Sequence, residues 1–381
     1  MKKIYLDNNS TTQLDSEILN EMLPFFNEKY GNPSSNSHSF GWEAKAAIDL
    51  SREKIATLIN ANTDEIIFTS GATESINLAI KGLINNTLKN EIITTSIEHK
   101  AVLDVCKKLK KSNKSNVTFI KPNKDGIITI DSIKNSITDN TSLISIMHAN
   151  NEIGTIQPIY DIGSLCKKNN IIFHVDAAQS IGKINIDVKE MNIDLLSVSS
   201  HKIYGPKGIG ALFIKNKQPK INLTPLIIGG GQENNYRGGT LPTPLIVGFG
   251  KACELAINKI ESDTERINML TSFLADSILD KFPETKINGC PKKRIPGNLN
   301  FTFPFLNGKS IIRLMPELAI SSGSACTSSD PSPSHVLKEL NINKLDANSS
   351  IRIGIGRFNN LEEIKIASKI IIEALSKNYD R

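Results

Sequence analysis

The sequence has no long hydrophobic run, and aromatic residues make up only 6% of it. No uninterrupted apolar stretch approaches the ~20 residues that a membrane-spanning helix needs, so we expect no membrane segment. The chain starts Met-Lys-Lys and reaches an acid at Asp7, which is too early for a secretory signal peptide. We therefore expect a cytoplasmic protein that has no membrane partner.

Cysteine is scarce, and its positions show no metal-binding spacing. The chain has five cysteines, an odd number, and no Cys-x-x-Cys pair, which argues against a disulfide framework and a four-thiolate zinc site. Cys166 and Cys253 lie in apolar helical patterns and should belong to the core. The surroundings of Cys106 and Cys290 stay open at this point. We expect chemistry at one or two thiols at most.

Cys326 differs from the other cysteines because small residues surround it between Ser321 and Ser329. No bulky apolar side chain is near enough in the sequence to bury this thiol, so we expect a mobile, exposed loop. A free thiol has a pKa of about 8.5, and its minority thiolate form is a competent nucleophile. An inert loop thiol is the alternative interpretation.

Positive charge exceeds negative charge modestly, giving a formal net charge of +6. A local cluster of lysines occupies Lys107, Lys108, Lys110, Lys111 and Lys114. Such a cluster suits either a nucleic-acid patch or the solvated face of a helix, and no aromatic residues interleave with it. We favour the solvated helix and expect no nucleic-acid partner.

From residue 66 onward, apolar strands alternate with helices. The expected strands are 66–69, 92–95, 117–120, 143–147, 171–176, 193–198 and 209–214. This alternation predicts an α/β fold with a mainly parallel sheet covered on both faces. Ligands of such folds bind outside the carboxyl ends of the strands. The polar candidates all fall at strand exits: Thr73, His99, Asn151, Asp176, Gln179 and Lys202.

The length permits a large core and two domains. We expect a large α/β domain over residues 16–250 and a smaller α+β domain made of residues 1–15 and 251–381. Helical spacing of apolar residues outside the alternating region is found in 16–30, 42–59, 245–281 and 361–375. The smaller domain should also contain strands near 298–303 and 351–355.

Lys202 stands at the exit of an apolar strand, before the Gly/Pro-rich run 205–210. A lysine there can be a solvated surface amine, or a partly desolvated amine that forms a Schiff base with an aldehyde. Asp176 ends another strand, where it can belong to an ordinary turn or serve as an anion for a pyridinium nitrogen. An amine and an anion at neighbouring strand exits suit pyridoxal phosphate, which also needs donors for its phosphate.

Other polar residues are open to both a structural and a cofactor role. The run 71–73 opens a helix, whose N–H groups can bind an anion or be capped in the usual way. His99 can stack on a planar cofactor, act as an acid or base, or merely start a helix. Asn151 and Gln179 suit a phenolic oxygen or loop contacts. Arg352 can hold a carboxylate or form a structural ion pair.

Together these stretches closely resemble the cysteine desulfurases of the NifS/IscS type, which are fold-type I pyridoxal phosphate enzymes grouped with the class V aminotransferases. The resemblance runs from Tyr5 to Phe358, nearly the whole chain. The matching motifs are Thr69–Ser75, Glu98–Lys100, Asn150–Gly154, His174–Gln179, Ser199–Gly208 and Ser322–Cys326.

The resemblance implies a role for each candidate residue. Lys202 bonds the cofactor covalently, Asp176 keeps its ring nitrogen protonated, and His99 stacks on the ring. Asn151 and Gln179 contact the ring oxygen. The implied phosphate ligands are Ala72, Thr73, Ser199, His201 and, from a partner subunit, Thr240.

The resemblance also implies the reaction. Arg352 and Asn151 bind L-cysteine, the amine of Lys202 moves the α-proton, and Cys326 takes the sulfur as a persulfide, leaving L-alanine. The implied assembly is a homodimer that passes sulfur to an acceptor protein such as an iron–sulfur scaffold, with Cys326 as a transient ligand of the cluster.

A class V aminotransferase or a selenocysteine lyase is the alternative, because either would share Lys202 and Asp176. Two features depart from the family pattern. The run 237–240 has glycine where these enzymes commonly have serine. The sequence also ends soon after its last expected helix, whereas housekeeping members carry a longer tail that docks the scaffold.

Overall fold

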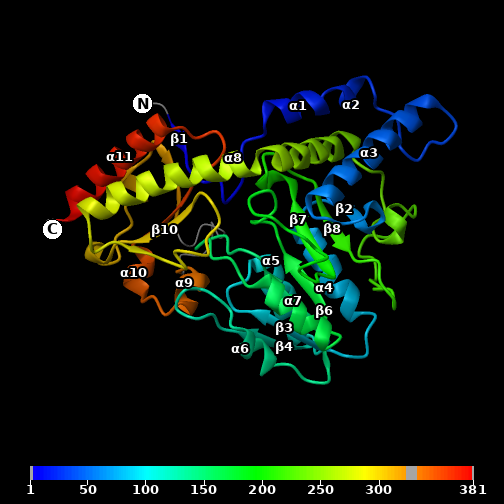
Figure 1. Ribbon diagram of the computed structural model, residues 1–381, viewed down its shortest axis with the longest axis horizontal. Coiled ribbons are helices and arrows are strands. Elements are labelled where there is room, and N and C mark those ends of the chain that lie inside the picture. The colour runs from blue at the N-terminus through cyan, green and yellow to red at the C-terminus, as the bar shows by residue number, and fades with distance from the viewer. Residues whose placement is uncertain (1–2, 323–332, 380–381) are drawn as a thin grey trace.

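The computed structural model of the protein describes residues 3–322 and 333–379. A seven-stranded sheet of order β2-β8-β7-β6-β5-β3-β4 lies in the larger half of the molecule (Figure 1). Its strands are β2 (Ile66–Thr69), β3 (Glu91–Thr95), β4 (Asn116–Ile120), β5 (Thr141–Met147), β6 (Ile172–Asp176), β7 (Leu195–Ser199) and β8 (Gly210–Ile214). Within this sheet β8 alone runs in the opposite direction to the other strands. The prediction of an α/β fold with a mainly parallel sheet is confirmed.

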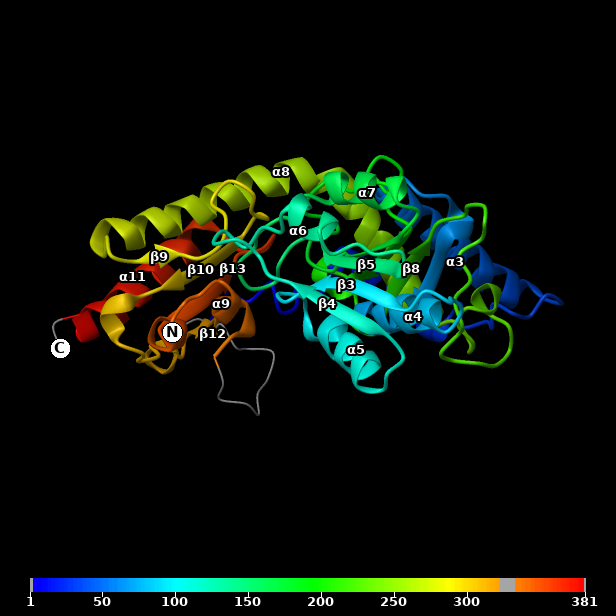
Figure 2. The ribbon, with the colours of Figure 1, turned by 90° about the horizontal axis from the view of Figure 1, so that it is seen from below.

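Helices cover both faces of this sheet because successive strand residues point to opposite sides. Ile66 and Leu196 belong to one core and their neighbours Ile67 and Leu195 to another. Helices α3 and α7 pack into the first core, and α4 and α5 pack into the second (Figure 2). The helices are α1 (Ser16–Met22), α2 (Pro24–Asn27), α3 (Ser39–Leu58), α4 (Ala72–Ile84), α5 (Lys100–Lys111), α6 (Ile130–Lys134) and α7 (Ile159–Lys168).

A smaller antiparallel sheet of order β12-β13-β10-β9 forms the centre of the other half. Its strands are β9 (Lys286–Ile287), β10 (Asn298–Thr302), β12 (Ser321–Ser322) and β13 (Ser350–Gly354). The N-terminal strand β1 (Ile4–Tyr5) pairs in parallel with β11 (Leu318–Ala319). The helices of this half are α8 (Thr243–Lys281), α9 (His335–Glu339), α10 (Lys344–Asn348) and α11 (Leu361–Tyr379).

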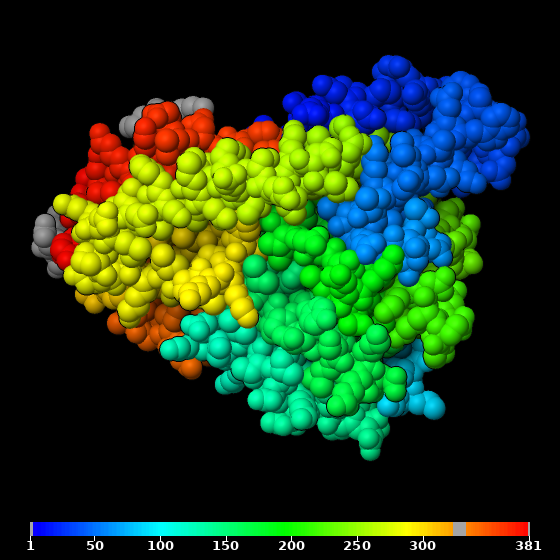
Figure 3. Space-filling view, viewed as in Figure 1, coloured from blue at the N-terminus to red at the C-terminus, as the bar shows by residue number. Residues whose placement is uncertain are grey.

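Helix α8 joins the two halves and lies along the surface of the molecule (Figure 3). Its first turns pack Ile246 and Phe249 into a core of the large sheet, and its later turns pack Leu270 and Ile278 into the smaller core. The expected domain boundary at residue 250 falls inside this helix, so the division of the chain into two domains stays a proposal. Among the described helices, none is both long and apolar enough to cross a membrane.

Candidate active site

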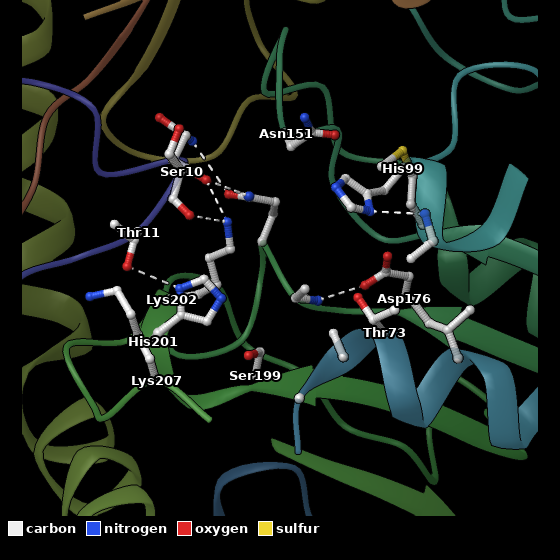
Figure 4. A pocket seen from close by; sticks show the side chains of 18 of the residues that line it. Ser10, Thr11, Thr73, His99, Asn151, Asp176, Ser199, His201, Lys202 and Lys207 are labelled. Atoms are coloured by element: carbon white, nitrogen blue, oxygen red, sulfur yellow. Dashed lines mark hydrogen bonds between the residues drawn. The ribbon is translucent and has the colours of Figure 1, made fainter. Parts of the chain in front are cut away.

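A cavity of about 530 Å³ lies at the carboxyl ends of the large-sheet strands. Most of the side chains expected from the sequence line it (Figure 4). They are Ala72, Thr73, His99, Asn151, Asp176, Gln179, Ser199, His201, Lys202 and Arg352. These residues come from several strand exits and from β13 of the smaller half, so the fold gathers positions that are far apart in the sequence.

Lys202 ends a short 3-10 turn that directly follows β7. Its Nζ donates hydrogen bonds to the carbonyl oxygens of Asn9 and Ser10, both at 2.7 Å. The N-terminal segment thus holds the amine inside the cavity. The alternative of an ordinary surface lysine does not fit this position.

Asp176 is the last residue of β6 and is only 5% exposed. Its Oδ1 accepts a hydrogen bond from the backbone N–H of Ala178 at 3.0 Å. Burial raises the pKa of the Asp176 carboxyl, against the opposing effects of that N–H and of His99 and Lys202. Burial penalises a charge that has no partner. A carboxylate in this setting therefore favours binding of a cationic or N–H group in the cavity.

His99 caps the N-terminus of α5, where its Nδ1 accepts the N–H of Ala101 at 3.1 Å. Burial lowers the pKa of this imidazole, and Asp176 opposes that effect. The ring is therefore neutral near pH 7 and carries its hydrogen on Nε2. Figure 4 shows the His99 ring beside Asp176 at the same side of the cavity. His99 therefore both caps α5 and lines the cavity.

The N-terminus of α4 opens onto the cavity without any side-chain cap. Gly71 precedes the helix at a φ of 149°, a conformation that only glycine adopts readily. Free N–H groups at the start of a helix make an anion site. The hydroxyls of Thr73 and Ser199 line the same part of the cavity. His201 lies nearby, with Nδ1 3.0 Å from Thr11 Oγ1, and burial lowers its pKa to about 4.

Arg352 extends from β13 and is only 2% exposed. One of its terminal nitrogens lies 2.8 Å from Asp7 Oδ1 and 2.6 Å from Ser10 Oγ, and the other donates to the Asn151 carbonyl at 3.1 Å. Its Nε is buried and has no described partner. The residue thus forms a structural ion pair and also lines the cavity. Gln179 Nε2 donates to the Asn9 carbonyl at 2.8 Å.

Comparisons with known proteins agree on one family. The family model described as aminotransferase class-V matches residues 4–366. A cysteine desulfurase IscS of Ehrlichia chaffeensis is 52% identical over 376 residues, which cover 98% of this chain and 91% of that protein. The chain belongs to the cysteine desulfurase family.

Solved structures agree with this membership of the desulfurase family. A NifS-like protein is 36% identical, covers 98% of this chain and 100% of its own, and superposes with a TM-score of 0.90. A structure titled SspA in complex with cysteine is 40% identical, covers 94% of this chain and 100% of its own, and has a TM-score of 0.83.

One described residue that was expected in this desulfurase site, Thr240, does not line the cavity. Thr240 is exposed, and it makes no contact with the cavity of its own subunit. Cys326 lies outside the described residues, and so does its expected iron–sulfur ligation. In the part of the chain that is described, no group of His, Cys, Asp and Glu could hold a metal. Cys106 and Cys290, whose surroundings the sequence left open, are buried.

Sequence reasoning missed the contribution of the N-terminal segment to this site. The sequence assigns residues 1–15 only to the smaller domain, yet Asn9, Ser10 and Thr11 line the cavity and contact Lys202, Gln179 and His201. The dense polar run in this segment was an available signal. This run did not indicate which residues it would contact. Most of these contacts are made by backbone carbonyl oxygens, which every residue type has.

Proposed function

We propose that this protein is a pyridoxal phosphate-dependent cysteine desulfurase that removes sulfur from L-cysteine and leaves L-alanine. The observation that carries the proposal is that Lys202 and the buried Asp176 line one cavity with an uncapped helix N-terminus. The relatives named cysteine desulfurase support the reaction, and the SspA structure titled as a complex with cysteine supports the substrate.

The donor set of the cavity fits pyridoxal phosphate. An amine, a buried carboxylate and free helix N–H groups correspond to the aldehyde, the ring nitrogen and the phosphate of that cofactor. We assign Lys202 to the aldehyde, Asp176 to the ring nitrogen and the neutral His99 to the ring face. Asn151 and Gln179 are assigned to the ring oxygen. The phosphate ligands are assigned as Ala72, Thr73, Ser199, His201 and, from a second subunit, Thr240.

The bound cofactor supplies an electron sink for the substrate carbons. Arg352 and Asn151 bind the substrate, with the guanidinium taking the α-carboxylate. The amine of Lys202 takes the α-proton and returns protons to carbon as alanine forms. Cys326 attacks the substrate sulfur as a thiolate, so that a new S–S bond forms while the C–S bond breaks. The sulfur remains on Cys326 as a persulfide.

We further propose that the enzyme is a homodimer. The segment of α2, α3 and their connection projects from one end of the molecule (blue in Figure 3). It exposes four aromatic side chains, which is unusual for a monomer's surface. They are Phe26, Tyr30, Phe40 and Trp42. A partner on this surface would also allow Thr240, which is exposed in one subunit, to reach the phosphate of the other.

The sulfur carried by Cys326 must leave for an acceptor protein in the cytoplasm, and we propose an iron–sulfur scaffold as that acceptor. Cys326 would then touch the assembling cluster as a transient ligand. The relatives' name IscS supports this destination in general terms.

The experiment that tests the proposed function is incubation of the purified holoenzyme with L-cysteine and a thiol reductant, which reduces the Cys326 persulfide and releases sulfide, followed by measurement of alanine and sulfide. We expect both products in equal amounts from the wild-type protein. Cys326→Ala should lose sulfide release and keep the visible absorbance of the bound cofactor. Transamination without sulfide, or activity restricted to selenocysteine, would instead favour a class V aminotransferase or a selenocysteine lyase.

A further inference from the structure

Helix α9 belongs to the smaller half of the molecule but packs against the larger half. Its Val336 joins a small apolar cluster with Ile97 and Ile153, separate from the three larger cores. Ile97 lies in the turn after β3, two positions before His99, and Ile153 lies in the turn after β5, two positions after Asn151. The helix therefore contacts both turns that present these site residues.

Polar contacts join the same two surfaces around this cluster. They pair Ser334 with Glu152, His335 with the carbonyl oxygen of Glu98, and Glu339 with Ser96. The contact between Ser334 Oγ and Glu152 Oε2 is buried, whereas the other two are partly exposed. Because solvent competes least for a buried contact, the Glu152 carboxyl is the strongest polar link to α9.

Glu152 is 6% exposed and directly follows Asn151. Its own carbonyl oxygen accepts hydrogen bonds from the side chains of Asn298 and Asn300, both at 3.2 Å. The backbone of this turn is thus fixed independently of the side chain. Among the described residues, Ser334 is the hydrogen-bond partner of the carboxyl, so the carboxyl acts on α9.

Charged groups on several elements act on this carboxyl. Burial raises the pKa of Glu152 to about 7, against Arg352 on β13 and Lys100 on α5. On α9 itself, His335 follows Ser334, and burial lowers the pKa of that imidazole, while Glu339 accepts a bond from Ser96 at 2.9 Å. An ionised carboxylate accepts a stronger hydrogen bond from a hydroxyl than a neutral acid does.

We propose that Glu152 is a positioning residue for the desulfurase reaction, whose carboxylate holds Ser334 and the start of α9 against the turn that presents Asn151. Ser334 follows Cys326 closely in the sequence. The contact with Glu152 therefore fixes the position of the chain shortly after Cys326. Delivery of the thiol to the substrate then depends on the charge of Glu152. The inference rests on the proposed function and adds a residue that the cofactor assignment does not use.

Glu152→Gln tests the inference because glutamine keeps the size and the acceptor oxygen but cannot ionise. We compare kcat and KM of the holoenzyme for alanine formation from pH 6 to pH 8. The kcat values of the two proteins should be similar at pH 6, and the variant should be about five- to tenfold slower at pH 8, since a charge-assisted hydrogen bond is about twice as strong as a neutral one. The KM for L-cysteine should stay within about twofold, because Arg352 is unchanged.

A second readout needs no turnover. The rate of Cys326 alkylation by iodoacetamide, measured by mass spectrometry of the peptide, should differ between wild type and Glu152→Gln at pH 8 and agree at pH 6. Ser334→Ala also removes the cap on the Leu337 N–H, so it should change the alkylation rate at both pH values, and adding Glu152→Gln to it should have no further effect at pH 8. The matched control Glu339→Gln removes the charge from another polar contact of α9, the one with Ser96, and it should leave the pH dependence of wild type intact.

A ratio of wild-type to variant kcat that is the same at every pH would overturn the inference, and so would a change confined to KM. If the wild-type protein forms no alanine at all, the proposed function fails instead. In that case the alkylation rates still decide whether Glu152 positions the stretch before α9. Thermal unfolding of each variant at pH 6 and pH 8 separates loss of positioning from loss of folding.

Discussion

At the scale of single residues, the buried carboxylate of Asp176 is the most constrained group of the candidate site. Burial raises its pKa, so an anion there is costly, and a cationic partner in the cavity would offset that cost together with the Ala178 N–H, His99 and Lys202. The ring nitrogen of the proposed cofactor is such a partner. The residue therefore matters for charge rather than for shape.

Asp176→Asn tests this view, since the amide keeps the shape and removes the charge. We expect alanine formation to fall by about 10²- to 10³-fold, as when one preorganised electrostatic group is lost from an active site. The variant should still fold and still bind the cofactor through Lys202 and the phosphate ligands. Product assays measure alanine formation, and the visible spectrum of the same sample measures cofactor binding. Near-normal turnover would contradict the assignment.

Glu98 illustrates a second kind of residue, a buried acid beside the site. Its Oε1 accepts bonds from the N–H of Met147 and the hydroxyl of Thr95, while its Oε2 is buried without a described partner. Burial raises the pKa of Glu98 from 4.5 to about 8. The folded protein therefore holds a proton that the unfolded chain releases above pH 4.5, and the stability contributed by this group falls as the pH rises toward 8.

Glu98→Gln should remove this pH dependence. The difference in unfolding free energy between variant and wild type should shift in favour of the variant between pH 5 and pH 9, by on the order of a few kcal/mol. Denaturant unfolding at both pH values measures it. A difference that is constant with pH would mean that Glu98 is ionised in the folded protein throughout.

The sequence predicted the polar residues at strand exits but not the buried acids. Lys202, Asp176 and His99 stand next to apolar runs that identify the strands, so their placement follows from the parallel sheet. Glu98 and Glu152 belong to the recognised motifs, yet the carboxyl of Glu98 contacts Met147 of β5, and the carboxyl of Glu152 contacts Ser334 at the start of α9, from a distant part of the chain. No local pattern carries that information.

At the scale of elements, the regular strands and helices follow the apolar pattern closely, and differences have local causes. The helical spacing over residues 16–30 gives two short helices, because Pro24 begins α2 immediately after α1 ends. Proline cannot supply the backbone hydrogen bond that would continue a helix, but it fits a first turn. The α4 helix shows the opposite case, where a glycine sets the start.

Gly71→Ala probes that start directly. The φ of 149° is costly for alanine, by roughly 1–3 kcal/mol. A Cβ there would lie 3.6 Å from Ser199 Oγ, which is ordinary contact, so strain rather than a clash should dominate. We expect lower thermal stability and weaker binding of pyridoxal phosphate to the apoprotein, measured by calorimetric titration. Unchanged binding would mean that the N-terminus of α4 does not bind the phosphate.

At the scale of the whole molecule, the site depends on both halves and, in our proposal, on two subunits. Arg352 reaches the cavity from β13, while Lys202 and Asp176 come from the large sheet. The sequence motifs predicted these residues together through the family resemblance. Periodicity alone could not predict that Arg352 reaches the cavity, because its side chain is held by Asp7 and Ser10 of the N-terminal segment and by the Asn151 carbonyl.

Trp42→Glu tests the proposed dimer surface. Trp42 is 57% exposed and Phe40 47%, so a charge at position 42 should cost little in one subunit but oppose association through the apolar surface. We expect sedimentation to show a smaller species than wild type, with weaker phosphate binding because Thr240 would no longer be supplied. Glu28→Gln on the same segment is the matched control and should stay dimeric.

The central claim is that Lys202 and Asp176 together direct sulfur from L-cysteine onto Cys326. The most direct measurement is mass spectrometry of the Cys326 peptide after brief exposure of the holoenzyme to L-cysteine. We expect a mass increase of one sulfur atom on that peptide in the wild-type protein, and none in Lys202→Ala or Asp176→Asn. Alanine production at the wild-type rate with no sulfur on Cys326, or sulfur loading that survives the loss of Lys202, would contradict the claim.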